Sequence, residues 1–251
     1  MPKEPPATIE NRWDLLYRDY PERYDAFAAV PKTPQTIDVL TDRFDFTDKL
    51  ILDIGSGSGA STLALAESAR TVIGLEVEDA MRAIALRSAI AEGCMNVAFV
   101  PGNALDIPFK DDLFDMVTAI TLPLFLPAEI AQFAAEALRV TKAGGAVINV
   151  GIAPFWYGGE LASVILGAER VTEVDTEGVV QRVLTEQFGF SHFDFFAHQE
   201  YGSVDKIVET YGFIFGQKAI DHLKAEAKTR IHWKFRVHFK YKEQPTIRRS
   251  S

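Results

Sequence analysis

Residues 49–62 read KLILDIGSGSGAST. Leu50 to Ile54 form a short apolar run, which is typical of a strand buried on both faces. Three glycines at alternate positions follow this run, and a helical pattern then begins near Ser61. The order of strand, glycine loop and helix predicts a nucleotide-binding turn, because glycine lets backbone N–H groups approach a ligand and a helix N-terminus adds partial positive charge.

The glycine pattern by itself fits two kinds of cofactor. Gly55, Gly57 and Ala60 satisfy G-x-G-x-x-A, a form of the fingerprint for nicotinamide or flavin dinucleotides. The neighbouring carboxylates favour another ligand. Asp53 ends the strand and could reach a cationic ammonium group, directly or through water. A second apolar run ends in Glu76, which is well placed to accept hydrogen bonds from both hydroxyls of a ribose.

Two further blocks follow in order, PGNALDIPF at residues 101–109 and LFDMVTA at residues 113–119. Together with D-x-G-x-G-x-G at residues 53–59, they resemble the motifs of the class I S-adenosylmethionine-dependent methyltransferases. The resemblance is close over about residues 49–151 and holds only in outline elsewhere. One departure is Asn103, where many members carry Asp, although its carbonyl oxygen can still accept a hydrogen bond from an adenine amino group.

This resemblance implies S-adenosylmethionine as the cofactor and S-adenosylhomocysteine as its product. The implied contacts come from the glycine loop, the end of the second strand, the loop that borders the adenine, and the residues just past the fourth strand. The expected cofactor-binding residues in these segments are Asp53, Gly55, Ser56, Gly57, Gly59, Glu76, Val77, Asn103, Ala104, Ile120 and Thr121.

Residues 1–48 are expected to form an N-terminal helical lid or cap. Five aromatic side chains recur there at spacings of four and three, which puts them on one helical face, with Pro21 dividing the run into two short helices. They are Trp13, Tyr17, Tyr20, Tyr24 and Phe27. The face fits plain packing as well as a lid. If it is a lid, Tyr17 and Tyr24 are the residues expected to touch the cofactor.

The rest of the chain predicts an α/β fold: a doubly wound, seven-stranded, mostly parallel sheet with helices on both faces and an antiparallel C-terminal strand. Residues 49–251 form this methyltransferase domain. We expect a turn at Gly144-Gly145 before a strand over 146–150, and one long helix over 203–228. Apolar and polar residues alternate over 230–241, which suits the closing antiparallel strand.

An insertion is expected at about residues 151–190, with helical patterns over 160–170 and 176–188. Similar enzymes place substrate-recognition elements at this point, over the carboxyl edge of the sheet. The aromatic residues Phe155, Trp156 and Tyr157 are therefore predicted to shape the acceptor pocket, together with Phe125, which follows the fourth strand. The apolar segment around Phe125 fits core packing equally well.

Composition limits the partners. A net charge of −9 argues against a nucleic-acid partner, because such binding relies on Lys and Arg at phosphates. The basic residues from Lys224 onward favour the solvated face of an edge strand over an RNA- or phosphate-binding surface. The single Cys94 permits no internal disulfide and suggests a cytoplasmic location. No apolar run reaches the length of a membrane span, and no metal site is expected.

The leading prediction is an enzyme that transfers a methyl group to a small-molecule acceptor by in-line displacement. The alternatives are a tRNA or protein methyltransferase, an NAD-dependent oxidoreductase, and a non-catalytic cofactor-binding scaffold. General bases among His192, His198, Glu200 and Glu129 are conceivable, but their spacing singles none out, and the catalytic residues remain unassigned. The acceptor atom and the oligomeric state also stay open.

Overall fold

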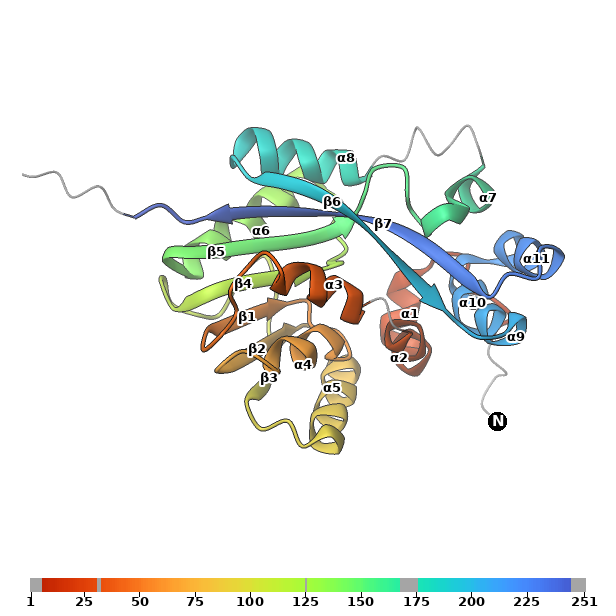
Figure 1. The fold of residues 1–251 in the computed structure, drawn as a ribbon, viewed down its shortest axis with the longest axis horizontal. Coiled ribbons are helices and arrows are strands. Elements are labelled where there is room, and N and C mark those ends of the chain that lie inside the picture. The colour runs from red at the N-terminus through yellow and green to blue at the C-terminus, as the bar shows by residue number, and fades with distance from the viewer. Residues whose placement is uncertain (1–5, 31–32, 125, 168–175, 245–251) are drawn as a thin grey trace, which may run out of the picture.

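The computed structural model describes residues 6–30, 33–124, 126–167 and 176–244. These residues form a seven-stranded sheet (Figure 1). Its strands are β1 (Leu50–Ile54), β2 (Thr71–Glu76), β3 (Val97–Pro101), β4 (Phe114–Ile120), β5 (Thr141–Ile152), β6 (Ser191–Glu200) and β7 (Arg230–Tyr241). The strand order is β3-β2-β1-β4-β5-β7-β6, and β7 runs antiparallel to both of its neighbours. The other pairs are parallel, so the predicted fold class is confirmed.

The helices of the described residues surround this sheet (Figure 1). They are α1 (Trp13–Asp19), α2 (Pro21–Ala29), α3 (Thr33–Thr41), α4 (Ala60–Ala66), α5 (Asp79–Glu92), α6 (Pro127–Val140), α7 (Ala162–Leu166), α8 (Thr176–Gln181), α9 (Val204–Ile207), α10 (Phe213–Phe215) and α11 (Gln217–Ala225). Pro21 begins α2, as predicted, because proline lacks the N–H that the helix interior needs. Gly93 ends α5 in the left-handed conformation. None of these helices is long and apolar enough to cross a bilayer.

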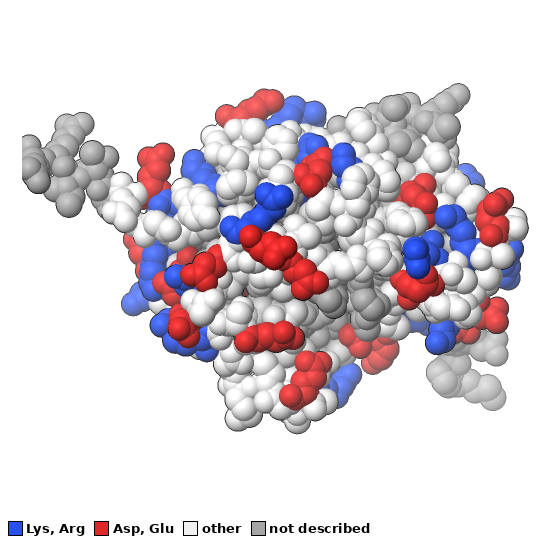
Figure 2. Space-filling model, viewed as in Figure 1, with Lys and Arg blue, Asp and Glu red and all other residues white. Residues whose placement is uncertain are grey.

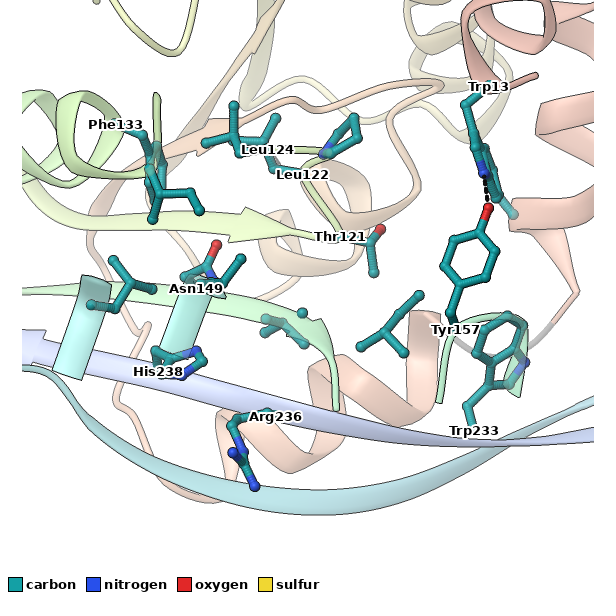
Figure 3. A pocket seen from close by; sticks show the side chains of 18 of the residues that line it. Trp13, Thr121, Leu122, Leu124, Phe133, Asn149, Tyr157, Trp233, Arg236 and His238 are labelled. Atoms are coloured by element: carbon teal, nitrogen blue, oxygen red, sulfur yellow. Dashed lines mark hydrogen bonds between the residues drawn. The ribbon is translucent and has the colours of Figure 1, made fainter. Parts of the chain in front are cut away.

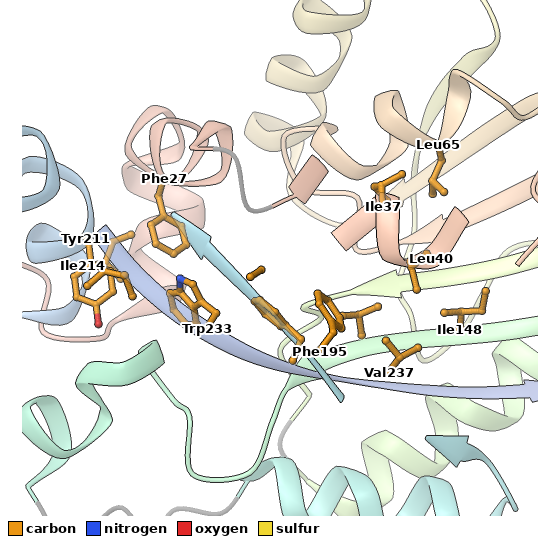
Figure 4. Packing of buried hydrophobic residues seen from close by; sticks show 14 of the residues in the cluster. Phe27, Ile37, Leu40, Leu65, Ile148, Phe195, Tyr211, Ile214, Trp233 and Val237 are labelled. Atoms are coloured by element: carbon orange, nitrogen blue, oxygen red, sulfur yellow. The ribbon is translucent and has the colours of Figure 1, made fainter. Parts of the chain in front are cut away.

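Two apolar layers bury the two faces of the sheet. On one face, Ile37 and Leu40 of α3 and Leu65 of α4 pack near Ile148 and Val237 (Figure 4). The opposite face carries residues of α6 and of a π-helical turn over Arg182–Gln187. Because side chains alternate along a strand, Val147 of β5 belongs to one layer, and its neighbours Ala146 and Ile148 belong to the other. The α3 segment is therefore part of the sandwich, although it lies within the predicted N-terminal lid.

The segment before α1 is held by the C-terminal part of the chain. The Ile9 N–H donates to the Phe213 carbonyl at 2.9 Å, and the Asn11 N–H donates to the Ile214 carbonyl at 2.8 Å. Helices α1 and α2 then lie beyond the end of the sheet at which β5 terminates (Figure 1). Residues from the two ends of the sequence thus meet beside the carboxyl edge of the parallel strands, where ligands bind in open α/β sheets.

Two predictions of local structure are wrong. Gly144 and Gly145 lie inside β5, where the Gly144 N–H donates to the Lys242 carbonyl at 2.8 Å. The register between β4 and β5 shifts here, because extra residues of β5 lie between the partners of Phe114 and Met116. The expected helix over residues 203–228 is broken at Gly216, whose φ of +98° ends one helical segment before another begins. The Glu10 carboxylate caps the new helix by accepting from the Gln217 N–H at 3.1 Å. The periodicity of residues 203–228 could not indicate this contact, because Glu10 is distant in sequence.

The two helical patterns predicted for the insertion are present in its described residues. A 3₁₀ turn over Gly159–Leu161 leads into α7, which ends at Leu166, and the expected extension to residue 170 lies outside the described residues. The predicted helix over 176–188 is present as α8 followed by the π-helical turn.

The basic C-terminal strand is not at an edge of the sheet, contrary to the sequence prediction, because β6 pairs along its outer side. Its cations are used in ion pairs: Arg236 and Lys234 both contact Asp194, at 2.6 and 2.9 Å. Figure 2 shows acidic and basic side chains interspersed on this side of the molecule. This arrangement offers phosphates no continuous basic surface on the face shown.

Candidate active site

The glycine loop joins β1 to α4 in conformations that favour glycine. Gly55, Gly57 and Gly59 have φ angles of +69°, +54° and +93°. A methyl group on Gly59 would lie 2.9 Å from the Cβ of Ala85, so the loop packs directly on α5. A methyl group on Gly55 would lie 2.5 Å from the Leu122 side chain. The loop is therefore pressed between α5 and the segment that follows β4.

Asp53 lies behind this loop. The residue is 1% exposed, and its carboxylate accepts hydrogen bonds from three hydroxyls: Ser61 and Thr62 at 2.7 Å and Thr118 at 2.9 Å. Burial raises the pKa of Asp53, and the three hydroxyls oppose that rise. Asp53 thus ties β1, α4 and β4 together, and its side chain lines neither of the cavities described below.

Glu76 ends β2 on the other side of the loop. The residue is 9% exposed, and its carboxylate accepts hydrogen bonds from the backbone N–H groups of Gly57 and Glu78, each at 2.9 Å. The carboxylate therefore fixes the glycine loop while it remains on the wall of a cavity. An acid at this place has free lone pairs for further donors, because each carboxylate oxygen can accept more than one hydrogen bond.

The first cavity, of about 250 Å³, extends from the glycine loop past Glu76 to the loop after β3. Most of the predicted cofactor-binding residues line it. They are Tyr17, Tyr24, Gly55, Gly57, Glu76, Val77, Asn103, Ala104 and Thr121. The other predicted residues, Asp53, Ser56, Gly59 and Ile120, do not line it. Ser56 lies against Gly74 of β2, Gly59 lies against Ala85 of α5, and Ile120 packs against the buried core.

Several lining residues were missed by the sequence analysis. They are Leu75, Glu78, Met81, Gly102, Leu105, Leu122, Pro123 and Leu124. Most adjoin a predicted residue in sequence, so widening each motif by a residue or two would have found them. Met81 comes from α5, and no motif signals it. Asn103 uses its side-chain oxygen to accept from the Leu105 N–H at 2.9 Å, which shapes the loop at this end of the cavity.

A second cavity, of about 120 Å³, adjoins the first, and six residues line both. These shared residues are Tyr17, Tyr24, Thr121, Leu122, Pro123 and Leu124; we call them the shared wall. Thr121 has a φ of +58°, which is an outlier for a β-branched residue, and its N–H donates to the Val150 carbonyl at 2.7 Å. Strain of this kind is typical of functional sites and here turns the chain sharply after β4.

The second cavity is mainly aromatic and apolar (Figure 3). Trp13 on α1 donates from Nε1 to the Tyr157 hydroxyl at 2.8 Å, so the N-terminal helix and the insertion close one side together. Tyr17 and Tyr24 stack edge to face with ring centroids 5.0 Å apart. Burial raises the pKa of Tyr17 well above its usual value and that of Tyr24 to about 12, so both are neutral hydroxyls at physiological pH.

Of the predicted acceptor residues, Tyr157 lines the second cavity, whereas Phe155 and Trp156 do not. Phe155 is 49% exposed at a φ of +68°, a backbone turn that directs it away from the cavity. Trp156 packs on Phe196, with ring centroids 5.8 Å apart. Phe125 lies outside the described residues.

Besides the hydroxyls of its aromatic residues and of Thr121, the second cavity has polar groups from β5 and β7. Asn149, Arg236 and His238 line it, and the sequence analysis selected none of them. The conceivable bases His192, His198, Glu200 and Glu129 line neither cavity. Among the described residues, no group of three His, Cys, Asp or Glu side chains is arranged to hold a metal ion.

Comparison with known proteins agrees with this geometry. A family described as a methyltransferase domain matches residues 51–145. The chain is 37% identical over 98 residues to a demethylmenaquinone methyltransferase of Clavibacter sepedonicus, a match that covers 39% of each chain.

Solved structures extend the similarity over most of the chain. A putative methyltransferase of Bacillus halodurans superimposes with a TM-score of 0.57 at 17% identity, over 84% of this chain and 99% of that one. A putative S-adenosyl-L-methionine-dependent methyltransferase of Methanococcus maripaludis gives 0.54 at 19% identity, over 90% and 92%.

The chain spans 39% to 56% of the length of the first curated relatives that it matches. The matched region contains the glycine loop, Glu76, Asn103 and Thr121, which border the first cavity. Residues 51–145 of the chain therefore match a methyltransferase domain, and the fold of the chain is that of the solved methyltransferase structures.

Proposed function

We propose that the protein transfers a methyl group from S-adenosylmethionine to a small-molecule acceptor by in-line displacement. The observation that carries this proposal is the pair of adjoining cavities with a shared wall. One is bordered by the glycine loop, Glu76 and Asn103, and the other is apolar and aromatic. Methyl transfer needs donor and acceptor in contact and aligned, and two adjacent cavities meet this need.

The residues of the first cavity fit the cofactor. Glu76 offers carboxylate oxygens to ribose hydroxyls, and the turn at Asn103 and Ala104 offers an edge to the adenine. The left-handed glycines keep side chains out of the space beside Tyr24, since a methyl group on Gly57 would lie 3.4 Å from that ring. When bound, the cofactor supplies a methyl group already activated by a positively charged sulfur. The chain's own contribution is to bind, to orient and to exclude water.

Orientation can supply most of the catalysis in such a site. Holding two reactants in a productive geometry is worth roughly 7–11 kcal/mol in favourable cases. The shared wall is suited to this role because Thr121 is held by its hydrogen bond to Val150 and the prolyl residue Pro123 restricts the chain nearby. The hydroxyls of Tyr17 and Tyr24 remain neutral there, so they can donate hydrogen bonds without adding charge.

We also propose that α1 and α2 act as the lid of this site. They supply Trp13, Tyr17, Tyr24 and Phe27 to the cavities, whereas α3 packs on the sheet. A small-molecule acceptor suits the enclosed aromatic space behind these helices. The relatives named demethylmenaquinone methyltransferases support an acceptor of this general class.

The proposal is tested by calorimetric titration with S-adenosylmethionine, S-adenosylhomocysteine and NAD. We expect the adenosyl compounds to bind and NAD not to bind. Glu76→Ala removes an anionic acceptor, and one charged hydrogen bond is worth about 1.5–3 kcal/mol, so affinity should fall at least about tenfold. Glu92→Gln, an exposed carboxylate on α5, is the matched control and should bind normally.

Transfer itself is then measured with S-adenosylmethionine carrying a labelled methyl group and a panel of neutral aromatic acceptors. Binding of NAD in place of the adenosyl compounds would overturn the assignment in favour of an oxidoreductase. Adenosyl binding without transfer to any small molecule, but with transfer to tRNA or protein, would overturn the acceptor class alone.

A further inference from the structure

We propose that His238 and Asn149 recognise a neutral hydrogen-bonding oxygen, a hydroxyl or a carbonyl, on an otherwise apolar acceptor. This inference rests on the proposed function, in which the second cavity holds the acceptor. His238 is thereby a specificity-determining residue that positions the acceptor at the end of the cavity away from the shared wall.

The two residues are direct neighbours across strands. Asn149 of β5 is paired with His238 of β7, and both line the second cavity below Phe133 of α6 (Figure 3). Directly opposed residues on antiparallel strands have Cβ atoms about 5 Å apart. A single oxygen atom of a ligand can therefore contact both side chains.

His238 is unusual among the buried polar side chains of the described residues. It is 2% exposed, and neither Nδ1 nor Nε2 has a hydrogen-bond partner there. Leaving a buried polar group unpaired costs about 1–3 kcal/mol, and an apolar ring of similar size would avoid that cost. An imidazole at this position is therefore explained by a partner that arrives with the ligand.

Charge defines the class of that ligand. Burial, with His192 and Arg236 nearby, lowers the pKa of His238 to about 4, so the ring is neutral and offers one donor and one acceptor. Arg236 is the one charged residue among the described lining, and Asp194 already holds it in a bidentate pair at 2.6 and 3.0 Å. Lys234 shares the same carboxylate. An anionic acceptor would therefore find no free cation in the cavity to pair with, whereas a neutral acceptor needs none.

The position of His238 and Asn149 in the sheet sets the length of the acceptor. His238 lies on the second strand from β4, so its backbone is about 10 Å from the strand that leads into Thr121. A molecule that touches both the shared wall and His238 has the length of two fused rings. His238 is accordingly assigned to binding, and no proton transfer to it is proposed.

The experiment uses three probes built on the same ring system: naphthalene, neutral 2-naphthol and anionic 2-naphthoate. Their dissociation constants are measured for the wild type, His238→Phe, His238→Gln and the control His222→Gln on α11, with and without S-adenosylhomocysteine. Affinity for S-adenosylhomocysteine also reports whether each variant is folded. We expect 2-naphthol to bind the wild type and the control about tenfold more tightly than naphthalene, as one hydrogen bond predicts.

His238→Phe should abolish that preference without weakening naphthalene, and His238→Gln should retain part of it. The naphthoate should bind at least about tenfold more weakly than 2-naphthol. Three results would overturn the proposal: His238→Phe keeps the wild-type preference for 2-naphthol over naphthalene, the naphthoate binds most tightly, or no probe binds at about 1 mM. A His238-dependent preference in a protein that does not bind S-adenosylhomocysteine would instead refute the proposed function and leave the cavity assignment standing.

Discussion

The buried imidazole of His238 predicts a specific loss of stability in acid. Its pKa is lowered in the folded protein from 6.5 to about 4 by burial, so the unfolded chain binds a proton more readily than the folded one. The stability associated with the neutral ring is complete above the unfolded pKa. It is lost as pH falls from about 6.5 to about 4, and below that value the loss levels off because the folded protein is protonated too.

The magnitude follows from the same two values. A fall in pKa from 6.5 to about 4 corresponds to a loss of about 3 kcal/mol over the whole window, since one pKa unit is worth about 1.4 kcal/mol. The carboxylates of Asp194 and Asp115, whose pKa values are lowered by their cationic partners and hydrogen bonds, lose their contribution at lower pH. The two effects therefore separate along the pH axis.

The assay is urea unfolding at intervals from pH 7.5 to pH 4.5, with the free energy of unfolding extrapolated to water. His238→Gln removes the titrating ring. Between pH 7.5 and pH 4.5, the free energy of unfolding of this variant should therefore fall by about 2–3 kcal/mol less than that of the wild type. His222→Gln should leave the wild-type curve unchanged. If His238→Gln and wild type fell in parallel, the ring would not be buried and neutral, and the reasoning on its charge would be refuted.

Two further predictions concern packing. Gly59→Ala should destabilise the fold by clearly more than Gly93→Ala. Both glycines have a positive φ, which costs about 1–2 kcal/mol for a non-glycine residue. Only at Gly59, however, would the new methyl group lie 2.9 Å from Ala85. Urea unfolding of the two variants checks this, and equal losses would contradict the close packing of the loop on α5. The Trp13–Tyr157 hydrogen bond should give a coupling energy of about 0.5–1.5 kcal/mol in a double-mutant cycle with Trp13→Phe and Tyr157→Phe. As a control, Trp156→Phe combined with Trp13→Phe should show no coupling energy. Zero coupling between Trp13→Phe and Tyr157→Phe would contradict a stabilising contact between α1 and the insertion.

The sequence was most informative where function and backbone geometry coincide. The left-handed glycines of the loop, the acid at the end of β2 and the alternation along β7 each leave a local signature. The structure has the predicted seven-stranded, mostly parallel sheet with an antiparallel C-terminal strand. The span of β7, Arg230–Tyr241, could be predicted from the sequence because its apolar side chains alternate with polar ones.

What could not be predicted depends on partners distant in sequence. Asp53 looked like a ligand contact, yet its carboxylate is satisfied by Ser61, Thr62 and Thr118, and the last of these lies on another strand. The helix that begins after Gly216 is capped by Glu10, which is distant in sequence. His238 appeared as one polar residue in an alternating strand, and only the register with Asn149 and the cover of α6 show that it borders a cavity.

The hydrogen bonds from Ile9 and Asn11 to α10 also bear on the order in which the site is assembled during synthesis. The residues that line the first cavity lie between Tyr17 and Leu124, so all of them have been synthesised when half of the chain has been made. The second cavity needs Trp233, Arg236 and His238, and the anchor of the N-terminal segment needs residues 213–217. Since domains are built from the N-terminus during translation, a ribosome-bound chain can complete its glycine loop long before it has an acceptor site.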